Sequence, residues 1–261
     1  MSNESTLIDS VKAEWIKFRS VRSSITGMLV TLLLTIGLGA LIGTAIRNNW
    51  HHMDPLRRAT FDPVASALVG TAFASFAIGV IGTLFITSEY STGSIRTSLA
   101  AVPNRPRLLL SKLVVLKTSV FIIAEIACFT AFAVVMAVFK GIVPTASLSN
   151  ASVLRAVFLG GVYLTLLAVL GFALGLILKQ SSICISVFVS LLLILPIIIL
   201  FLPSSWQDHI SKFEPSELGR SMMSASTQAN HFTAWTATGI LALYVLALLA
   251  TGFALFTRRD A

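Results

Sequence analysis

The residues that could do chemistry in this chain are few, and they fall into one polar stretch and one isolated carboxylate. The polar stretch, residues 89–112, carries Glu89, Tyr90, Gly93 and Arg96 among small polar side chains. The isolated carboxylate, Glu125, lies inside a long apolar run. A loop with a carboxylate and several arginines suits docking to a protein partner. An ionisable group within an apolar run is typical of a substrate or proton pathway, or of a hydrogen-bonded structural position.

Other chemistries lack the residues they need. A phosphate-binding loop requires Gly-x-x-x-x-Gly-Lys followed by Ser or Thr, and the sequence contains no such run, so we expect no nucleotide site in this chain. Cys128 and Cys184 sit in apolar runs, where a lone thiol is typical of packing. We therefore expect no catalytic residue, no metal and no cofactor on this chain. Intramembrane proteolysis is disfavoured because all four histidines lie in connecting loops or at the edge of a run, at positions 51, 52, 209 and 231.

The elements that position these residues follow from an unusually apolar composition. Of the 261 residues, 56% are hydrophobic and 11% are charged, with a mean hydropathy of +0.88. A soluble domain is about one quarter charged, because its surface faces water. The composition therefore predicts that most of this surface faces lipid.

Six apolar runs are long enough to cross a bilayer, which takes roughly 20 residues of helix. The runs cover residues 23–46, 63–88, 113–139, 152–178, 182–203 and 232–257. Buried backbone groups need internal partners in lipid, and the runs do not alternate as barrel strands would. We expect an all-α polytopic membrane protein, forming one transmembrane domain over residues 1–261.

Two local patterns refine these runs. Asp62 and Pro63 are typical of a helix start, with Asp as the cap and Pro at the first helical position. Pro196 interrupts the fifth run and predicts a kink, which could line a substrate path or only adjust packing.

The net charge of +8 is distributed in a way that favours membrane topology over nucleic-acid binding. Six spans place both termini on one side of the membrane. That side carries twelve of the 19 lysines and arginines, and the other side carries seven. The positive-inside bias then predicts cytoplasmic termini in a plasma-membrane protein, with lipid and not nucleic acid as the partner of the basic residues.

A segment before the first span is expected to form a helix at the membrane interface. Over residues 6–20, apolar side chains recur at helical spacing, while Lys12, Lys17 and Arg19 lie mainly off that stripe. The segment could anchor the chain at the headgroups or pass motion from a cytoplasmic partner to the first span. The stripe consists of Leu7, Ile8, Val11, Trp15 and Phe18.

The polar stretch predicts a short helix between two breaks. Gly93 can end the preceding helix in a left-handed conformation, and Pro103 can stop the next one. A helix over residues 94–101 would present Ile95 and Leu99 on one side, and Asn104 would begin the following helix. The residues themselves fit a docking element and an ordinary basic loop equally well.

The same stretch resembles a known family. The run Glu89-Tyr-x-x-Gly93-Ser-Ile-Arg96, with the following Pro-x-Arg and Ser-Lys, is similar to membrane subunits of type-2 ABC exporters. The resemblance is strongest to small six-span permeases of Gram-positive and actinobacterial genomes, of the bacitracin- and lantibiotic-immunity type. The segments 14–23 and 213–219 resemble the same permeases. The Pro- and Gly-containing signature of daunorubicin-type permeases is missing near the fifth span.

This resemblance implies a partner and a mechanism. The loop after the second span would be a coupling helix seated on a separate ATPase subunit, which would hold the ATP and Mg. The residues that carry over to this coupling role are Glu89, Tyr90, Gly93, Arg96 and Arg105. A second permease copy, as a homodimer or heterodimer, would complete the path for an amphipathic substrate such as a peptide antibiotic, a drug or a lipid-like compound.

A secondary transporter or channel is the main alternative. It would give Glu125 a function in the membrane. It would not explain the elaborated stretch 89–112, and the repeated halves common in such transporters are not evident.

Overall fold

The computed structural model describes residues 6–226 and 231–258, and over these residues the chain is helical with no strand. Six helical segments within the described residues are long and apolar enough to cross a membrane. The expected all-α fold with six helices of this kind is confirmed. The spans are α2 (Arg22–Asn49), α5 (Thr71–Ser91), α7 (Arg105–Phe139), α8 (Ala151–Leu178), α9 to α10 (Ser181–Val189, Leu195–Leu200) and α13 (Ala234–Arg258).

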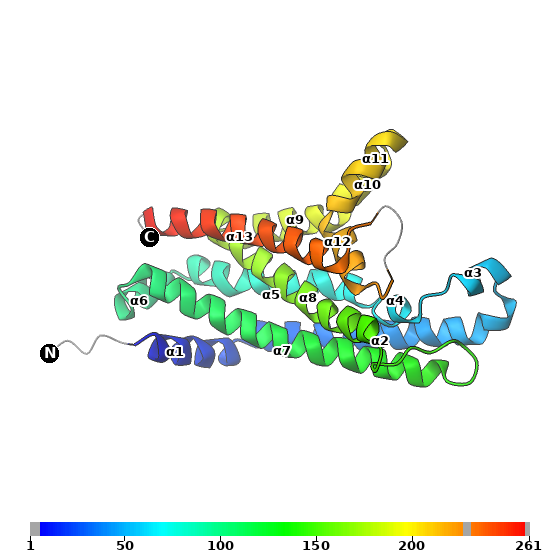
Figure 1. Cartoon of the computed structure of the whole chain (residues 1–261). Coiled ribbons are helices and arrows are strands. Elements are labelled where there is room, and N and C mark those ends of the chain that lie inside the picture. Colours follow the sequence, from blue (N-terminus) through cyan, green and yellow to red (C-terminus); the bar gives the residue numbers. More distant parts are fainter. Residues whose placement is uncertain (1–5, 227–230, 259–261) are drawn as a thin grey trace.

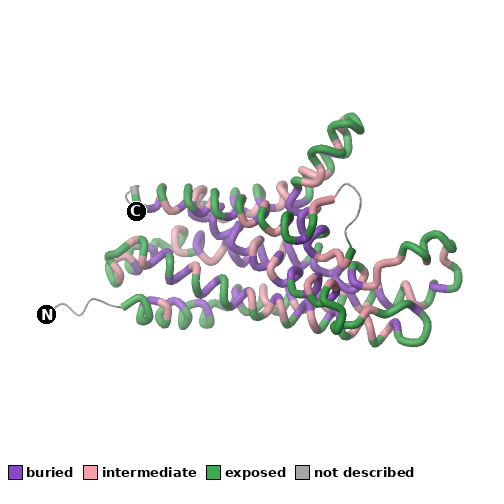
Figure 2. Tube along the Cα trace, viewed as in Figure 1, coloured by how far each residue is buried: buried purple, intermediate pink, exposed green. Residues whose placement is uncertain are grey.

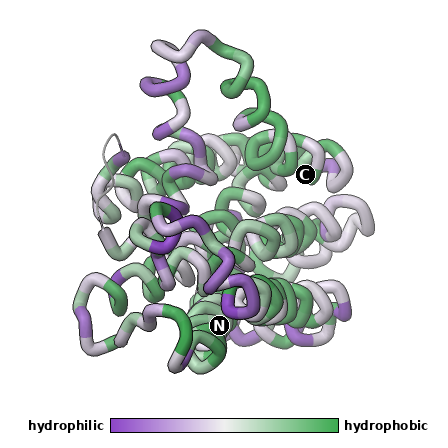
Figure 3. Tube along the Cα trace, turned by 90° about the vertical axis from the view of Figure 1, so that its right-hand side faces the viewer, coloured by the Kyte–Doolittle hydropathy of each residue, from purple (hydrophilic) through white to green (hydrophobic). Residues whose placement is uncertain are grey.

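The spans lie side by side, with short helices at their ends (Figure 1). Helices α1 (Leu7–Ser20) and α6 (Ser94–Ala101) lie at the same end of the bundle as the end of α13. Helix α3 (Pro55–Ala59) and the 3-10 turn η1 (Trp50–His52) lie at the opposite end. Seen from that opposite end, hydrophilic residues gather mainly in the connecting segments, and the helices behind them are largely hydrophobic (Figure 3).

Helix α8 is the centre of the bundle. It packs against α5, α7 and α13, and 78% of its most apolar stretch is buried. Only 17% of the most apolar stretch of α2 and 22% of that of α13 are buried, so these helices turn much of their surface outward (Figure 2). An apolar outer surface is expected where lipid or another membrane subunit is the neighbour.

Small residues allow α5 and α8 to pack closely. A Cβ atom added to Gly82 of α5 would lie 2.7 Å from the carbonyl carbon of Ala168 in α8. A Cβ atom on Gly171 of α8 would collide with the carbonyl oxygen of Gly79. Close backbone approach at small residues is a usual way of joining helices in lipid, where the hydrophobic effect does not drive helix association.

The second span differs from the continuous helix expected over 63–88. Asp62 does cap a helix as predicted, since its Oδ1 accepts hydrogen bonds from the amides of Val64 (2.8 Å) and Ala65 (3.1 Å). That helix, α4 (Pro63–Ala67), ends after five residues, and α5 starts only at Thr71. At the break, Gly70 lies so close to the backbone of α2 that a Cβ would meet the carbonyl oxygen of Leu34 at 2.5 Å. The expected continuity was wrong because the turn fits against α2.

The third span starts earlier than the predicted residue 113. Asn104 caps α7 by accepting a hydrogen bond from the amide of Arg107 at 3.1 Å. The helix has 35 residues, and at 1.5 Å per residue it is about 52 Å long. This exceeds the roughly 30 Å of a hydrocarbon core, so part of the helix extends beyond it. Lys112, expected at the boundary of the span, therefore lies two turns inside a helix.

The fifth span is kinked, as Pro196 predicts. A π-helical turn, η2 (Ser190–Ile194), ends two residues before the proline, and α10 bends away from the bundle with α11 (Ser204–Ile210) (Figure 1). Proline removes one backbone donor from the helix, and a π-turn accommodates the change. A short 3-10 turn, η3 (Ser211–Phe213), then leads to α12 (Pro215–Met223), which packs on α8 and α13.

Candidate functional site

Helix α1 turns a polar face toward the bundle. It begins with a capping box, in which Thr6 accepts from the amide of Asp9 and Asp9 accepts from the amide of Thr6. Its buried residues are Ser10, Glu14 and Phe18, which recur every four residues along one face. Of the expected apolar stripe, Phe18 is buried, Val11 is half-buried and three residues are exposed, namely Leu7, Ile8 and Trp15.

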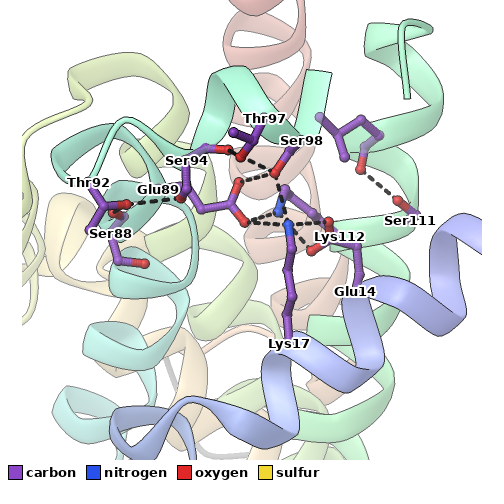
Figure 4. Close-up of polar contacts among 11 residues, drawn as sticks. Glu14, Lys17, Ser88, Glu89, Thr92, Ser94, Thr97, Ser98, Ser111 and Lys112 are labelled. Carbon is purple, nitrogen blue, oxygen red and sulfur yellow. Dashed lines mark hydrogen bonds and ion pairs between the residues drawn. The ribbon is translucent and has the colours of Figure 1, made fainter. Parts of the chain in front are cut away.

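The polar face of α1 meets a charge cluster formed by Glu14, Lys17, Glu89 and Lys112, of which all but Lys17 are largely buried (Figure 4). The Nζ atom of Lys112 lies 2.7 Å from Glu14 Oε2 and 2.6 Å from Glu89 Oε1, and its side chain is fully buried. Lys17 Nζ lies 3.2 Å from Oε1 of each of the same carboxylates. The two ammonium groups thus neutralise the two carboxylates, and the four residues come from three helices, α1, α5 and α7.

Helix α6 is attached to this cluster through Ser98. Lys17 donates to Ser98 Oγ at 2.8 Å, and that hydroxyl donates to Glu89 Oε2 at 3.4 Å. Burial disfavours the charged ammonium of Lys17, but the carboxylates of Glu14 and Glu89 outweigh this effect and raise the pKa of Lys17. The charge cluster therefore joins α1, the end of α5, α6 and the start of α7.

The predicted residues of the polar stretch have different surroundings. Gly93 adopts a left-handed conformation with φ of 72°, and α6 starts at the next residue. Within α6, the side chain of Ile95 is buried, whereas that of Arg96 is exposed. Tyr90 is half-buried, and Lys179 Nζ lies 5.2 Å from the centre of its ring.

Two predicted residues contact the protein interior instead of forming an exposed surface. Glu89 points into the charge cluster, with 12% of its side chain exposed. Arg105 donates to the carbonyl oxygens of Phe256 and Thr257 at 3.4 Å, which links the start of α7 to the end of α13. A cation is favourable at the carbonyl end of a helix.

Glu125 faces α8. A Cβ atom on Gly161 would lie 2.5 Å from Glu125 Cδ, so this glycine leaves the space that the carboxylate fills. Both carboxylate oxygens are buried and have no hydrogen-bond partner among the described residues. Such an arrangement is costly in a membrane unless a ligand, a proton or water compensates the carboxylate.

Pro196 is half-buried. The residue before it, Leu195, lines a recess of about 420 Å³ together with Leu191 of the kinked span and Tyr244 of α13. No group of three or more metal-ligating side chains occurs within residues 6–226 and 231–258.

Sequence reasoning missed the role of Lys112 and Glu14. The sequence places Lys112 at the end of the polar stretch 89–112 and Glu14 at the start of the segment 14–23, and it predicts no contact between them. The available signal was the four-residue spacing of Ser10, Glu14 and Phe18, which places a carboxylate on the same helical face as a large apolar residue. Nothing in the sequence identified Lys112 as its partner across 98 residues.

The six long apolar helices indicate a multi-pass membrane protein, and a charge cluster lies at one end of these helices. The chain belongs to the family described as "Protein of unknown function (DUF2705)", whose model matches residues 56–261. The matched region includes Glu89, α6 and Lys112, whereas Glu14 and Lys17 precede it. No curated protein matches the chain.

Proposed function

We propose that this chain is the permease subunit of an ATP-binding-cassette exporter in the plasma membrane, with both termini in the cytoplasm. A separate ATPase subunit would bind ATP and Mg and would dock on α6. The cargo would be an amphipathic or hydrophobic molecule, such as a peptide antibiotic, a drug or a lipid-like compound. The proposal combines the resemblance of the stretch 89–112 to such permeases with the way in which α6 is attached to the spans.

The observation that carries the proposal is the buried bridge of Lys112 to Glu14 and Glu89. A docking helix can drive a transporter only if its displacement reaches the spans. Because buried ion pairs with good geometry resist separation, a push on α6 would move α1, α5 and α7 together. An ordinary basic loop would not need this attachment.

The geometry suggests different roles for the predicted coupling residues. Arg96 is exposed on α6 and would contact the ATPase. Glu89 points inward and would hold α6 in position, so it is a positioning residue. Arg105 would pass the same movement to α13 through the carbonyl oxygens at that helix end.

A second permease copy would complete the transport path. Helices α2, α13 and the α9–α10 span leave most of their apolar surface outside the bundle, with 17–22% of their most apolar stretches buried. These surfaces are available to lipid and to a partner subunit. We propose that substrate passes between two copies and enters from the lipid.

The test is ATPase coupling in nanodiscs. The chain is co-expressed with the ABC-type ATPase encoded nearest to it, and ATP hydrolysis by the purified complex is compared with that of the ATPase alone. We expect complex formation, loss of binding in Arg96→Ala, and uncoupled hydrolysis in Glu89→Ala. Arg57→Ala is the matched control, because this arginine is exposed on α3 at the opposite end. A chain that purifies without an ATPase and moves solute without ATP would overturn the proposal.

A secondary transporter is the second candidate, and the unpartnered carboxylate of Glu125 favours it. In that case Glu125 would take up a proton or contact the substrate during transport. Replacing Glu125 by Gln keeps the shape and removes the charge, so transport should fall while expression is maintained. Equal losses of transport and expression would assign Glu125 to structure alone.

A further inference from the structure

A pocket lies between α4, α8, α12 and the start of α13, away from the end that carries α6. Its volume is about 440 Å³, within the range of small-molecule sites. Its ionisable lining residues are Asp62, Arg155, Glu217, Arg220 and His231, and we call it the Arg155 pocket. Apolar side chains, including Leu68, Met223 and Phe232, form another part of its wall.

Both acidic residues of the pocket already have partners. Glu217 Oε2 lies 3.2 Å from Arg220 Nη1, and its Oε1 lies 3.1 Å from His231 Nδ1. Asp62 Oδ1 accepts two backbone amides at the start of α4, where the helix end favours negative charge. The contacts of both carboxylates are therefore to groups other than Arg155 in the described residues.

Arg155 is a cation of the pocket that forms no ion pair with a carboxylate in the described residues. Its Nη2 donates to the carbonyl oxygen of Ser224 at 3.0 Å, and its Nε is buried without an acceptor in the described parts of the chain. No carboxylate within residues 6–226 and 231–258 forms an ion pair with Arg155. A guanidinium that lines a pocket and has no carboxylate partner is a favourable contact for an anion, because hydrogen bonds between charged groups are the strong ones.

We propose that the Arg155 pocket binds a small amphiphile with an anionic headgroup, a carboxylate or a phosphate, on a short apolar body. The headgroup is held by Arg155, and the body packs on Leu68, Met223 and Phe232. The anionic group reaches the pocket either on a membrane lipid or on a soluble molecule. This site is separate from the α6 end and does not depend on an ATPase partner.

The probe for the test is hexyl phosphate, which combines a phosphate with a six-carbon chain. Its binding to the full chain in phosphatidylcholine nanodiscs is measured by calorimetry, with empty nanodiscs subtracted. We expect saturable binding that Arg155→Gln weakens by about tenfold or more, the effect of losing one charge-assisted contact. Hexyltrimethylammonium, with the same chain and the opposite charge, should not bind.

Two further variants make the result independent of whether the Arg155 variant folds. Ala72→Leu adds bulk at an exposed position of the pocket lining and leaves every charge in place, so it should also weaken binding. Arg57→Gln removes an arginine outside the pocket and should bind as the wild type does. Hexyl phosphate binding that is unchanged by both pocket variants, or that does not saturate, would overturn the proposal.

The lipid composition separates the two sources of the anion. If an anionic lipid headgroup occupies the pocket, nanodiscs that contain phosphatidylglycerol should weaken hexyl phosphate binding by competition, and this effect should disappear in Arg155→Gln. If the ligand is soluble, phosphatidylglycerol should leave the affinity unchanged. Each result supports an anion site and assigns its occupant.

Discussion

Replacing Lys112 by methionine tests the charge cluster most directly. The lysine side chain is fully buried, and the side chains of Glu14 and Glu89 are 4% and 12% exposed. The substitution leaves two nearly buried carboxylates with Lys17 as their only cation in the cluster, a local net charge of −1. Removing one partner of a buried ion pair costs about 3–5 kcal/mol, so we expect the free energy of unfolding to fall by about that amount.

The size of this effect should depend on burial. Lys17 contacts the same two carboxylates, but 44% of its side chain is exposed. Lys17→Met should therefore cost much less, on the order of 1 kcal/mol, because solvent screens the remaining charges. The apolar methionine occupies a similar volume at each position, so the comparison isolates charge from packing.

The assay is reversible unfolding in mixed micelles, followed by circular dichroism across a denaturant series. A triple variant, with Glu14→Gln and Glu89→Gln added to Lys112→Met, removes all the buried charges at once. We expect it to recover most of the lost stability, since unpaired charge and not lost volume is the main cost. A loss below about 1 kcal/mol in Lys112→Met, or a triple variant as unstable as the single one, would refute the reasoning.

Three further predictions test other parts of the fold. Gly82→Ala should destabilise the protein by about 1–3 kcal/mol, because the new methyl group meets the α8 backbone. Gly37→Ala should be neutral or slightly stabilising in the same unfolding assay, because a Cβ there meets nothing within 4 Å. The pKa of Lys17 is raised above its ordinary value of 10.5, so the stabilisation that Lys17 contributes is complete below pH 10.5 and is lost as the pH rises through the raised pKa. In alkaline titrations above pH 10.5, the wild type should therefore lose more stability than Lys17→Met. Thr6→Ala removes the N-cap of α1. Hydrogen–deuterium exchange of the first amides of α1 should become faster by the factor that corresponds to about 1 kcal/mol of lost helix stability.

The sequence predicted the spans well because membrane insertion imposes a simple physical rule. A run of apolar residues must be helical in lipid, and the predicted runs correspond to helices in the described residues. Local signals were equally informative. Asp62 caps α4, Gly93 takes the left-handed conformation and Pro196 follows a π-turn, and each outcome depends on neighbours within a few residues.

The remaining features depend on contacts between distant segments. The break at Gly70 is set by the backbone of α2, which no local pattern reports. The ion pairs of Lys112 join residues separated by 23 and 98 positions, and lysine near the end of a span is more often placed in the headgroup region. The surroundings of Arg155 were also unpredictable, because they depend on how α12 packs beside α8.

The central position of α8 has a consequence for how freely the sequence of this protein can change. A helix surrounded on all sides has no face on which a larger or differently shaped side chain is harmless, so a saturation mutagenesis profile of α8 should show intolerance at nearly every position. Helices α2 and α13, with most of their surface outside the bundle, should instead show tolerance that rises and falls with the helical repeat. A second protein subunit packed against either helix would appear in such a profile as an intolerant stripe on its outward face, and lipid alone would leave that face free to vary among apolar residues.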